Sequence, residues 1–192
     1  MFYHKGITLF VPDKVYYPRE DSLLLAGVLE KQKLRKKKVL DMGCGSGFLA
    51  ILLAKTAIVT ATDSNSLAVK ITMDNAKRNN VRLKAVKSDL FKKVKGRYDL
   101  IVFNSPYLPI DDEHKDASYD GGKDGRAVIR RFIKNAKKYL KKNGKALLLI
   151  SSLTGEKEVL GLFSNNKFKT RVLTREKVPW EELIVIEARA AL

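Results

Sequence analysis

The chain has 192 residues, of which 45% are hydrophobic and five are proline, a composition that suits one α/β domain over 1–192 and excludes a disordered protein. Its single cysteine excludes an internal disulfide framework and a cysteine-based zinc site, and the lack of a long apolar run or signal-peptide pattern predicts a cytoplasmic protein without membrane contact. The net charge of +17 favours an anionic partner such as RNA, the ribosome or an acidic protein.

The first part of the chain, 1–37, is expected to be irregular except for one apolar helix over 22–30. Pro18-Arg19-Glu20-Asp21 opens this helix, and acidic side chains in a first turn suit the positive end of the helix dipole. We expect this N-terminal segment and its helix to cover a cofactor site.

Strands and helices alternate after residue 37. This alternation predicts a Rossmann-like, doubly wound sheet of seven mostly parallel strands with helices on both faces. The last two strands follow each other directly, which predicts an antiparallel hairpin at one edge of the sheet. The expected strands are 38–42, 57–62, 83–86, 98–103, 145–150, 169–174 and 183–188, and the expected helices are 48–55, 66–79, 126–141 and 156–165.

The stretch 104–125 is predicted to be a long irregular loop, which in a compact domain usually indicates function. Its glycine-containing tract, 119–126, could form a hinged substrate lid or a flexible turn into the next helix, and the sequence leaves both alternatives open. His114 in this loop is expected to be an exposed residue rather than a catalytic base.

Three lysine- and arginine-rich clusters lie at 31–38, 92–97 and 134–142, mostly on or beside expected helices. Such charge runs are usually solvated helix faces. A solvated surface is therefore favoured over a dedicated nucleic-acid surface, although the net charge keeps nucleic acid open as a partner.

A glycine-rich turn, Gly43-Cys44-Gly45-Ser46-Gly47, follows the first strand of the expected sheet. In a doubly wound fold, ligands bind beyond the carboxyl ends of the strands where the strand order reverses, and this turn marks that point. Glycine permits a tight turn and a close ligand, and the next helix offers unpaired N–H groups. The pattern alone is shared by proteins that bind nicotinamide, flavin or S-adenosylmethionine (SAM).

Acidic residues around the turn narrow the choice of cofactor. Asp63 ends the second strand, where its carboxylate can accept hydrogen bonds from two ribose hydroxyls. Asp89 follows the third strand and could accept from an adenine amino group, with Leu90 covering the ring. Asp41 would disfavour a nearby pyrophosphate but suits the ammonium and sulfonium of SAM, so SAM is favoured over a dinucleotide.

Each of these residues also has a purely structural interpretation. Asp63 could cap the turn at Ser64-Asn65-Ser66, and Asp89 could cap a short turn. Cys44 is expected to be a small loop residue rather than a nucleophile, because no basic partner is evident.

The segment Asn104-Ser105-Pro106-Tyr107 follows the fourth strand and points to the group that accepts the methyl. The nitrogen of a carboxamide or exocyclic amine is a poor nucleophile because its lone pair is delocalised. Two acceptors, the Asn104 side-chain oxygen and the Ser105 carbonyl, could grip the N–H bonds and orient the lone pair while the Tyr107 ring covers the planar group. Methyl transfer then depends on orientation more than on a strong base. The alternative is an ordinary proline-containing turn.

At these residues the chain resembles the HemK-like glutamine methyltransferases, which modify the Gly-Gly-Gln loop of translation release factors. The segment 39–47 looks like their SAM loop, and Asn104-Ser105-Pro106-Tyr107 looks like their N-P-P-Y motif. The segments 17–22 and 121–126 are similar to those of the short archaeal and eukaryotic branch, which lacks the helical N-terminal domain of the bacterial enzymes. The resemblance covers nearly the whole chain and implies a class I methyltransferase fold.

The resemblance also implies roles for individual residues and partners. SAM, which leaves as S-adenosylhomocysteine, would contact Ser22, Asp41, Gly43, Cys44, Gly45, Gly47, Asp63, Ser64, Asp89 and Leu90. Asn104 and Tyr107 would hold the substrate amide, with Ser105 and Pro106 completing the catalytic motif. Ser105 replaces the first proline of the family motif, which keeps the carbonyl contact but should make the loop less rigid. The short branch is associated with a small zinc-binding activator subunit.

Other functions stay open on the residues alone. An adenine-N6 or guanine-N2 methyltransferase acting on RNA or DNA would present the same planar NH2 group to the same motif, and the +17 charge favours it. A protein-lysine methyltransferase is weaker, because an ammonium must first lose its proton and no convincing base is present. A non-catalytic RNA-binding protein with this fold would be expected to lack Asp63 or Asn104, and a nicotinamide-dependent enzyme is disfavoured by Asp41.

Overall fold

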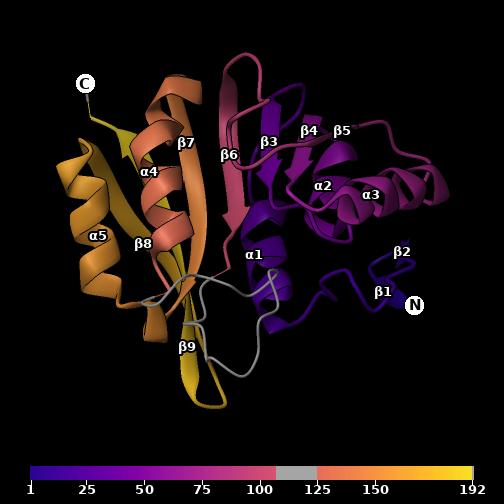
Figure 1. The fold of residues 1–192 in the computed structure, drawn as a ribbon, viewed down its shortest axis with the longest axis horizontal. Helices are drawn as coiled ribbons and strands as arrows, with labels where there is room; N and C mark the ends of the chain where they lie inside the picture. Colours follow the sequence, from indigo (N-terminus) through magenta and orange to yellow (C-terminus); the bar gives the residue numbers. More distant parts are fainter. Residues whose placement is uncertain (107–124, 192) are drawn as a thin grey trace.

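A computed structural model describes residues 1–106 and 125–191, and its centre is one seven-stranded sheet (Figure 1). The strand order is β5-β4-β3-β6-β7-β9-β8, and every neighbouring pair is parallel except the two pairs that β9 makes with β7 and β8. The predicted mostly parallel sheet with an antiparallel hairpin at one edge is therefore confirmed. The strands are β3 (Lys38–Met42), β4 (Ile58–Asp63), β5 (Lys84–Lys87), β6 (Tyr98–Asn104), β7 (Leu140–Ser151), β8 (Phe168–Val178) and β9 (Glu181–Ala190).

Helices cover both faces of the sheet. One face packs against α1 (Glu20–Glu30), α2 (Phe48–Ala54) and α3 (Ser66–Arg78), and the other against α4 (Ala127–Tyr139) and α5 (Glu156–Asn165), which follows the short 3-10 helix η1 (Ser152–Thr154). Successive strand residues point to opposite faces. Leu100 and Val102 of β6 thus join the α1–α2 core, while Ile101 and Phe103 join the α4–α5 core. The central strands β3, β6 and β7 contain nearly continuous buried apolar runs because both of their faces are covered, whereas the edge strands β5 and β8 are more polar.

The N-terminal segment was predicted to be irregular before its helix, but it contains a β-hairpin. Residues 2–9 form a small antiparallel sheet of β1 (Phe2–His4) and β2 (Ile7–Leu9), joined by a turn at Lys5 and Gly6 that both have positive φ. Such a two-residue turn suits a tight hairpin. The prediction failed because three-residue strands are too short to show a two-residue period.

Two asparagines, Asn75 in α3 and Asn79 just after its end, fasten this segment to the rest of the fold. The Asn79 side chain accepts from the Thr8 N–H and donates to the Thr8 carbonyl, at 2.9 and 2.8 Å. The Asn75 side chain does the same for Phe10, at 2.9 Å for both bonds, and also donates to the Ser46 carbonyl in the glycine-rich turn. The N-terminal segment and the glycine-rich turn therefore share one buried amide.

The remaining predicted elements are found with small shifts in their ends. The largest concerns β7, where Tyr98 pairs with Leu140 and Leu100 pairs with Lys145. Residues 141–144 were expected to lie at the end of the helix and in the turn after it. They instead lie inside β7, where they interrupt its regular pairing with β6, and Asn143 has a left-handed backbone conformation.

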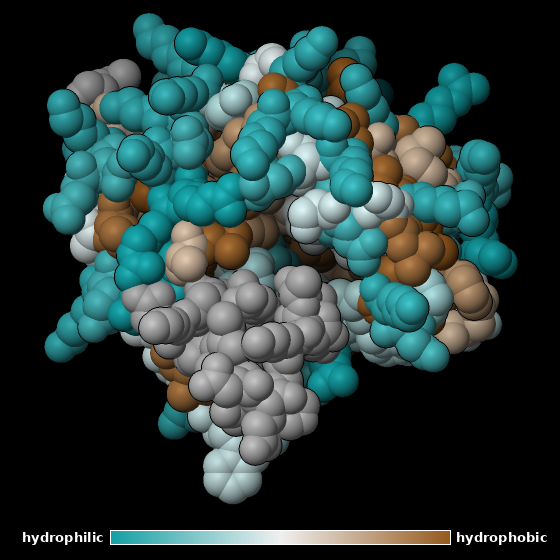
Figure 2. Space-filling model, viewed as in Figure 1, coloured by the Kyte–Doolittle hydropathy of each residue, from teal (hydrophilic) through white to brown (hydrophobic). Residues whose placement is uncertain are grey.

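The surface in Figure 2 is covered mostly by hydrophilic side chains on the face shown, which agrees with the large share of charged residues. Over 1–106 and 125–191, the structure has no helix that is both long and apolar enough to span a membrane.

Candidate cofactor and substrate site

The predicted site residues come from segments that meet at the carboxyl edge of the sheet. From β3 the chain continues through β4 and β5 on one side and then returns to β6 on the other, so the strand order reverses between β3 and β6. This is the place at which open α/β sheets bind ligands. Here the turn after β3 is hydrogen-bonded to the end of β4 and lies beside Phe103 of β6, and the end of β6 is hydrogen-bonded to the start of α1.

The glycine-rich turn has a backbone that needs glycine. Gly43 and Gly47 have φ of +68° and +87°, which side-chain-bearing residues rarely adopt. A Cβ at Gly43 would lie 3.3 Å from the Phe103 ring, and one at Gly47 would lie 3.0 Å from Thr72. The Cys44 N–H donates to the Thr62 carbonyl at 2.9 Å, so β4 fixes the turn. The turn is a preformed backbone cradle that opens onto the N-terminus of α2.

Cys44 lies buried in this turn, where its sulfur accepts a hydrogen bond from the Thr72 hydroxyl at 3.2 Å. Burial, followed by the negative charges of Asp63 and Asp41, raises the pKa of the thiol well above its usual range. A thiol held neutral is a poor nucleophile, which agrees with the prediction that Cys44 is a packing residue.

Asp63 connects the turn to the end of β4. One carboxylate oxygen accepts from the Gly45 N–H at 2.9 Å, and the other accepts from the Asn65 N–H at 2.8 Å. Burial raises the pKa of this carboxyl, while the N–H donors of Asn65 and Gly45 act in the opposite direction. The expected turn-capping role is present, and a carboxylate can accept further bonds from hydroxyl groups. Ser64, the next residue, is exposed.

Asp41 is the most unusual group in the site. It is 1% exposed, and its Oδ2 atom has no hydrogen-bond partner in the part of the chain that the structure describes. Burial, with a smaller contribution from the negative charge of Asp63, raises the pKa of this carboxyl from 3.8 to about 8, although the Ala50 backbone N–H opposes the shift. A buried polar atom without a partner is costly. A positively charged ligand would supply the partner and favour the ionised form.

Asp89 and Leu90 lie in the turn after β5. The Asp89 carboxylate contacts Arg131 at 2.6 Å and Lys92 at 2.9 Å, and these hydrogen bonds lower its pKa. In the structure it is thus paired on the protein surface, and its predicted contact with an adenine amino group remains a prediction. Leu90 is half-buried with a φ of +46°. The Ser88 N–H donates to the Asp63 carbonyl at 2.8 Å, which holds this turn beside the end of β4.

Asn104 ends β6 and contacts the start of α1. Its amide nitrogen donates to an Asp21 carboxylate oxygen at 3.0 Å and lies 3.4 Å from the Ser22 hydroxyl. Its Oδ1 atom is buried and has no hydrogen-bond partner within residues 1–106 and 125–191. Ser22, which is expected to contact SAM, thus lies beside Asn104, and its predicted role remains a prediction, as does the role of the Asn104 oxygen in holding a substrate amide. Asp21 lies in the quoted segment 17–22 but was assigned no role from the sequence, because its contact with Asn104 spans 83 residues.

Ser105 is buried, and its hydroxyl donates to the Leu149 carbonyl of β7 at 2.9 Å. The rigidity expected to be lost with the family proline is thus offset by a bond that fastens the turn to the neighbouring strand. Pro106 is half-buried. Tyr107, His114 and the tract 119–124 lie outside the described residues, so their predicted roles stay predictions.

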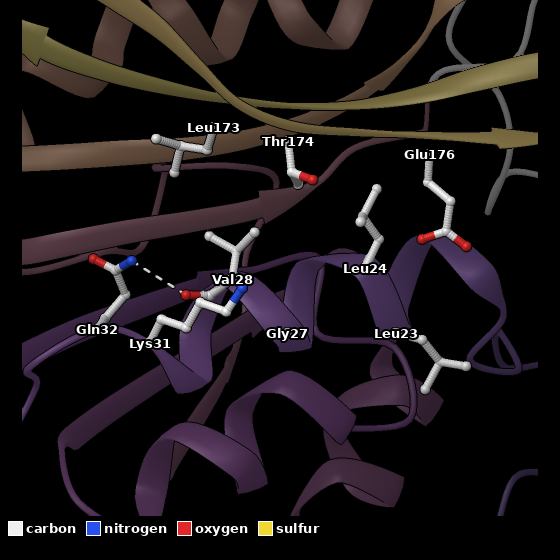
Figure 3. A pocket seen from close by; sticks show the side chains of 9 residues that line it. All are labelled: Leu23, Leu24, Gly27, Val28, Lys31, Gln32, Leu173, Thr174 and Glu176. Carbon is white, nitrogen blue, oxygen red and sulfur yellow. Dashed lines mark hydrogen bonds between the residues drawn. The ribbon is translucent and has the colours of Figure 1, made fainter.

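A groove of about 500 Å³ lies elsewhere, between α1 and the edge strand β8 (Figure 3). Leu24 and Val28 of α1 face Leu173 and Thr174 of β8 across it, and Leu23 also lines it. None of the predicted cofactor or substrate residues lines this groove, so it is separate from the candidate site.

Comparison with known proteins identifies a protein family that matches this chain. The family described as "Methyltransferase small domain" matches residues 19–176, a range that contains every predicted site residue. Over 191 residues the chain is 45% identical to a protein of Methanocaldococcus jannaschii named "Putative protein N5-glutamine methyltransferase", with 96% of each protein covered. It is 32% identical over 197 residues to the release factor glutamine methyltransferase of Streptococcus pneumoniae, with 95% of this chain and 70% of that protein covered.

Among solved structures, the chain matches one chain of the Mtq2–Trm112 complex of E. cuniculi with a TM-score of 0.78 and 30% identity. The match covers 93% of this chain and 99% of that one. The complex is described as responsible for methylation of the eRF1 translation termination factor.

Proposed function

Because the chain belongs to the methyltransferase small domain family, we propose that it transfers a methyl group from SAM to a glutamine side-chain amide in the Gly-Gly-Gln loop of a translation release factor. The chain has the class I methyltransferase fold, and it is an enzyme of the protein N5-glutamine methyltransferase type by its similarity to these relatives. The observation that carries the substrate proposal is the free, buried Oδ1 of Asn104 at the carboxyl end of β6.

The residues at the edge of β3 fit SAM. The unpartnered Asp41 carboxyl suits a cationic ligand, the positive-φ glycines leave the backbone of the turn accessible, and Asp63 retains acceptor capacity for hydroxyl groups. A pyrophosphate would face the Asp41 carboxyl, so a dinucleotide fits less well. When bound, SAM supplies a methyl group on a positively charged sulfur.

The residues proposed to bind the substrate have to orient a weak nucleophile, the side-chain amide nitrogen of the glutamine. The Asn104 Oδ1 atom can accept one N–H of the incoming amide, and the backbone carbonyl of Ser105, the next residue, is proposed to accept the other. Holding both N–H bonds directs the nitrogen lone pair, so the rate comes from orientation and fixed dipoles rather than from a strong base. The nitrogen gains the methyl group and loses one proton to solvent, giving a methylated amide and S-adenosylhomocysteine.

The proposed substrate and partner follow from the relatives. The similar proteins are named for release-factor glutamine methylation, and the similar solved chain belongs to a two-protein complex. We therefore include a small activator subunit, zinc-binding in the family that the sequence resembles, in the proposal. A translation factor as substrate implies a cytoplasmic reaction.

The test is methyl transfer from labelled SAM to purified release factor and, in parallel, to total RNA with and without nuclease. We expect label on the release factor and no label after its Gly-Gly-Gln glutamine is replaced. Label confined to nuclease-sensitive material would move the enzyme to the adenine-N6 or guanine-N2 class, which the +17 charge favours. Each assay is repeated with the activator subunit added, so that a missing partner is not mistaken for a wrong substrate.

A further inference from the structure

We infer that Asp21 is a positioning residue that keeps the Asn104 side chain turned with its oxygen toward the substrate amide. This inference deepens the proposed function and rests on it, because it concerns the group proposed to hold the glutamine. It begins from the contrast between the two ends of the Asn104 side chain, of which one is firmly bonded and the other is free.

The bonded end lies against a buried carboxylate. Asp21 is 3% exposed, in the first turn of α1, and α1 contacts β6 (Figure 1). One of its oxygens, Oδ2, accepts from the Asn104 NH2 group at 3.0 Å and from the Tyr16 hydroxyl at 2.6 Å. The other accepts from the Ser22 N–H. The carboxylate therefore serves protein donors on both of its oxygens.

The choice of an acid at this position has a chemical reason. The two ends of a carboxamide have nearly the same shape, so an asparagine can turn over with little change in packing. An ionised carboxylate only accepts hydrogen bonds, so it binds the NH2 end and repels the oxygen end. The Ser22 hydroxyl, at 3.4 Å, can both donate and accept and cannot make this choice.

The chosen orientation is the one that the proposed reaction requires. With the NH2 group held by Asp21, the Oδ1 atom of Asn104 is the end left without a partner. A turned-over side chain would present NH2 to the substrate amide and could not accept its N–H. Asp21 touches neither reacting atom, so its effect runs entirely through Asn104.

Tyr16 extends this arrangement to the cofactor half of the site. A Cβ placed at Gly45 would lie 3.5 Å from the Tyr16 Cβ, so the residue that bonds Asp21 also packs against the glycine-rich turn. The segment 16–22 thus links the proposed cofactor and substrate groups.

The kinetic test compares Asp21→Ala with Glu20→Ala, which removes an exposed carboxylate from the same helical turn. We expect Asp21→Ala to lower kcat for release-factor methylation roughly 30- to 100-fold, because a misplaced orienting group loses that much rate, while the Kd for SAM stays within about twofold. Glu20→Ala should keep wild-type kcat. Asp21→Asn keeps an acceptor oxygen but adds a donor NH2 group, so it should select the Asn104 orientation less strictly and give a kcat between those of Asp21→Ala and wild type, roughly 10-fold below wild type.

A direct readout uses the side-chain NH2 signals of Asn104 in an NMR spectrum, assigned by their loss in Asn104→Ser. We expect these two protons to be shifted and slowly exchanging in the wild type and in Glu20→Ala, and to move toward solvent-like values in Asp21→Ala. Unchanged Asn104 signals in Asp21→Ala, or equal losses of SAM affinity and kcat, would overturn the inference. If the wild type does not methylate the release factor at all, the proposed function fails, and the NMR comparison still decides whether Asp21 fixes Asn104.

Discussion

Two regions of the site each contain one buried carboxyl group, and the two groups have opposite surroundings. Asp41, beside the glycine-rich turn, is 1% exposed and has an oxygen without a partner. Asp21, at the start of α1, is 3% exposed and accepts bonds from Tyr16, Ser22 and Asn104. Burial alone therefore does not distinguish them, whereas the number of donors around each group does.

The difference indicates what each carboxyl is for. A buried acceptor without a donor is destabilising in the ligand-free protein and becomes favourable when a cationic ligand arrives, so Asp41 has the properties of a binding group. A carboxylate already satisfied by protein donors has little to gain from a ligand, so Asp21 has the properties of a framework group. Asn104 gives its donor end to Asp21 and leaves its acceptor end without a partner among the described residues.

The largest effect is expected for Asn104→Ala, which removes the free acceptor. We expect kcat to fall about 100-fold or more, as for the loss of an oriented contact made in the transition state, with SAM affinity nearly intact. Steady-state kinetics and calorimetry measure the two quantities, and Asn165→Ala at an exposed position of α5 serves as a control. Equal losses of binding and rate would contradict the assignment of Asn104 to the substrate half.

Asp41→Asn is expected to have a smaller effect than Asn104→Ala, and to lower SAM affinity rather than kcat. The affinity for SAM should fall on the order of 10- to 100-fold, corresponding to about 1.5–3 kcal/mol for a hydrogen bond to a charged group. The melting temperature of the ligand-free protein should rise near neutral pH, because the variant does not have to bind on folding a proton that the unfolded wild-type chain has released. Asp74→Asn, which changes the same charge at an exposed site on α3, should leave SAM affinity unaltered. A variant at Asp41 that binds SAM normally would remove the distinction between the two carboxyls.

The pH dependence of SAM binding sharpens the same point. The pKa of Asp41 is about 8 in the ligand-free protein, and a cationic ligand would favour the ionised form, so binding below pH 8 should release a proton. Affinity should therefore rise up to roughly tenfold per pH unit between pH 6 and 8, and this slope should vanish in Asp41→Asn. Calorimetry in buffers of different ionisation enthalpy measures the proton, and a wild-type slope of zero would argue against direct contact.

The same shift has a consequence for the free energy of unfolding. Between pH 3.8 and about 8, the folded protein retains a proton on Asp41 that the unfolded chain has released. The contribution of this group to stability is therefore present at low pH and is lost as the pH rises through that range. Asp41→Asn should flatten this part of the stability curve of the ligand-free protein, which denaturant titrations at pH 5 and 8 would measure.

The smallest effect is expected for Ser105→Ala. Loss of the hydroxyl bond to the Leu149 carbonyl should cost about 1 kcal/mol and lower Tm by roughly 2–4 °C. Ser164→Ala, at an exposed position near the end of α5, should lower Tm by less. An unchanged Tm in Ser105→Ala would mean that this hydrogen bond does not fasten the turn after β6.

The sequence predicted the parts of the molecule that depend on local patterns. Apolar runs, glycine positions and the alternation of strands with helices identified the sheet, the turn at 43–47 and the acid at Asp41. The Asn104–Asp21 contact could not be predicted in this way, because it joins residues 83 positions apart through side chains on different elements. The ion pair of Asp89 with Arg131 could not be predicted either, because it depends on how α4 packs beside the turn after β5. The sequence did not predict the hairpin of β1 and β2, because strands of three residues are too short to show an alternating pattern.

The side-chain amide of Asn75 connects the first ten residues to the glycine-rich turn of the candidate site. It bonds both backbone groups of Phe10 and also the Ser46 carbonyl of the glycine-rich turn. Opening of the N-terminal segment would remove the two Phe10 bonds that help to fix this amide, and the same amide holds the turn, so we expect the two segments to be coupled in local unfolding. A ligand that tightens the turn should accordingly slow hydrogen exchange at the Phe10 amide, although Phe10 lies outside the group of residues expected to touch that ligand.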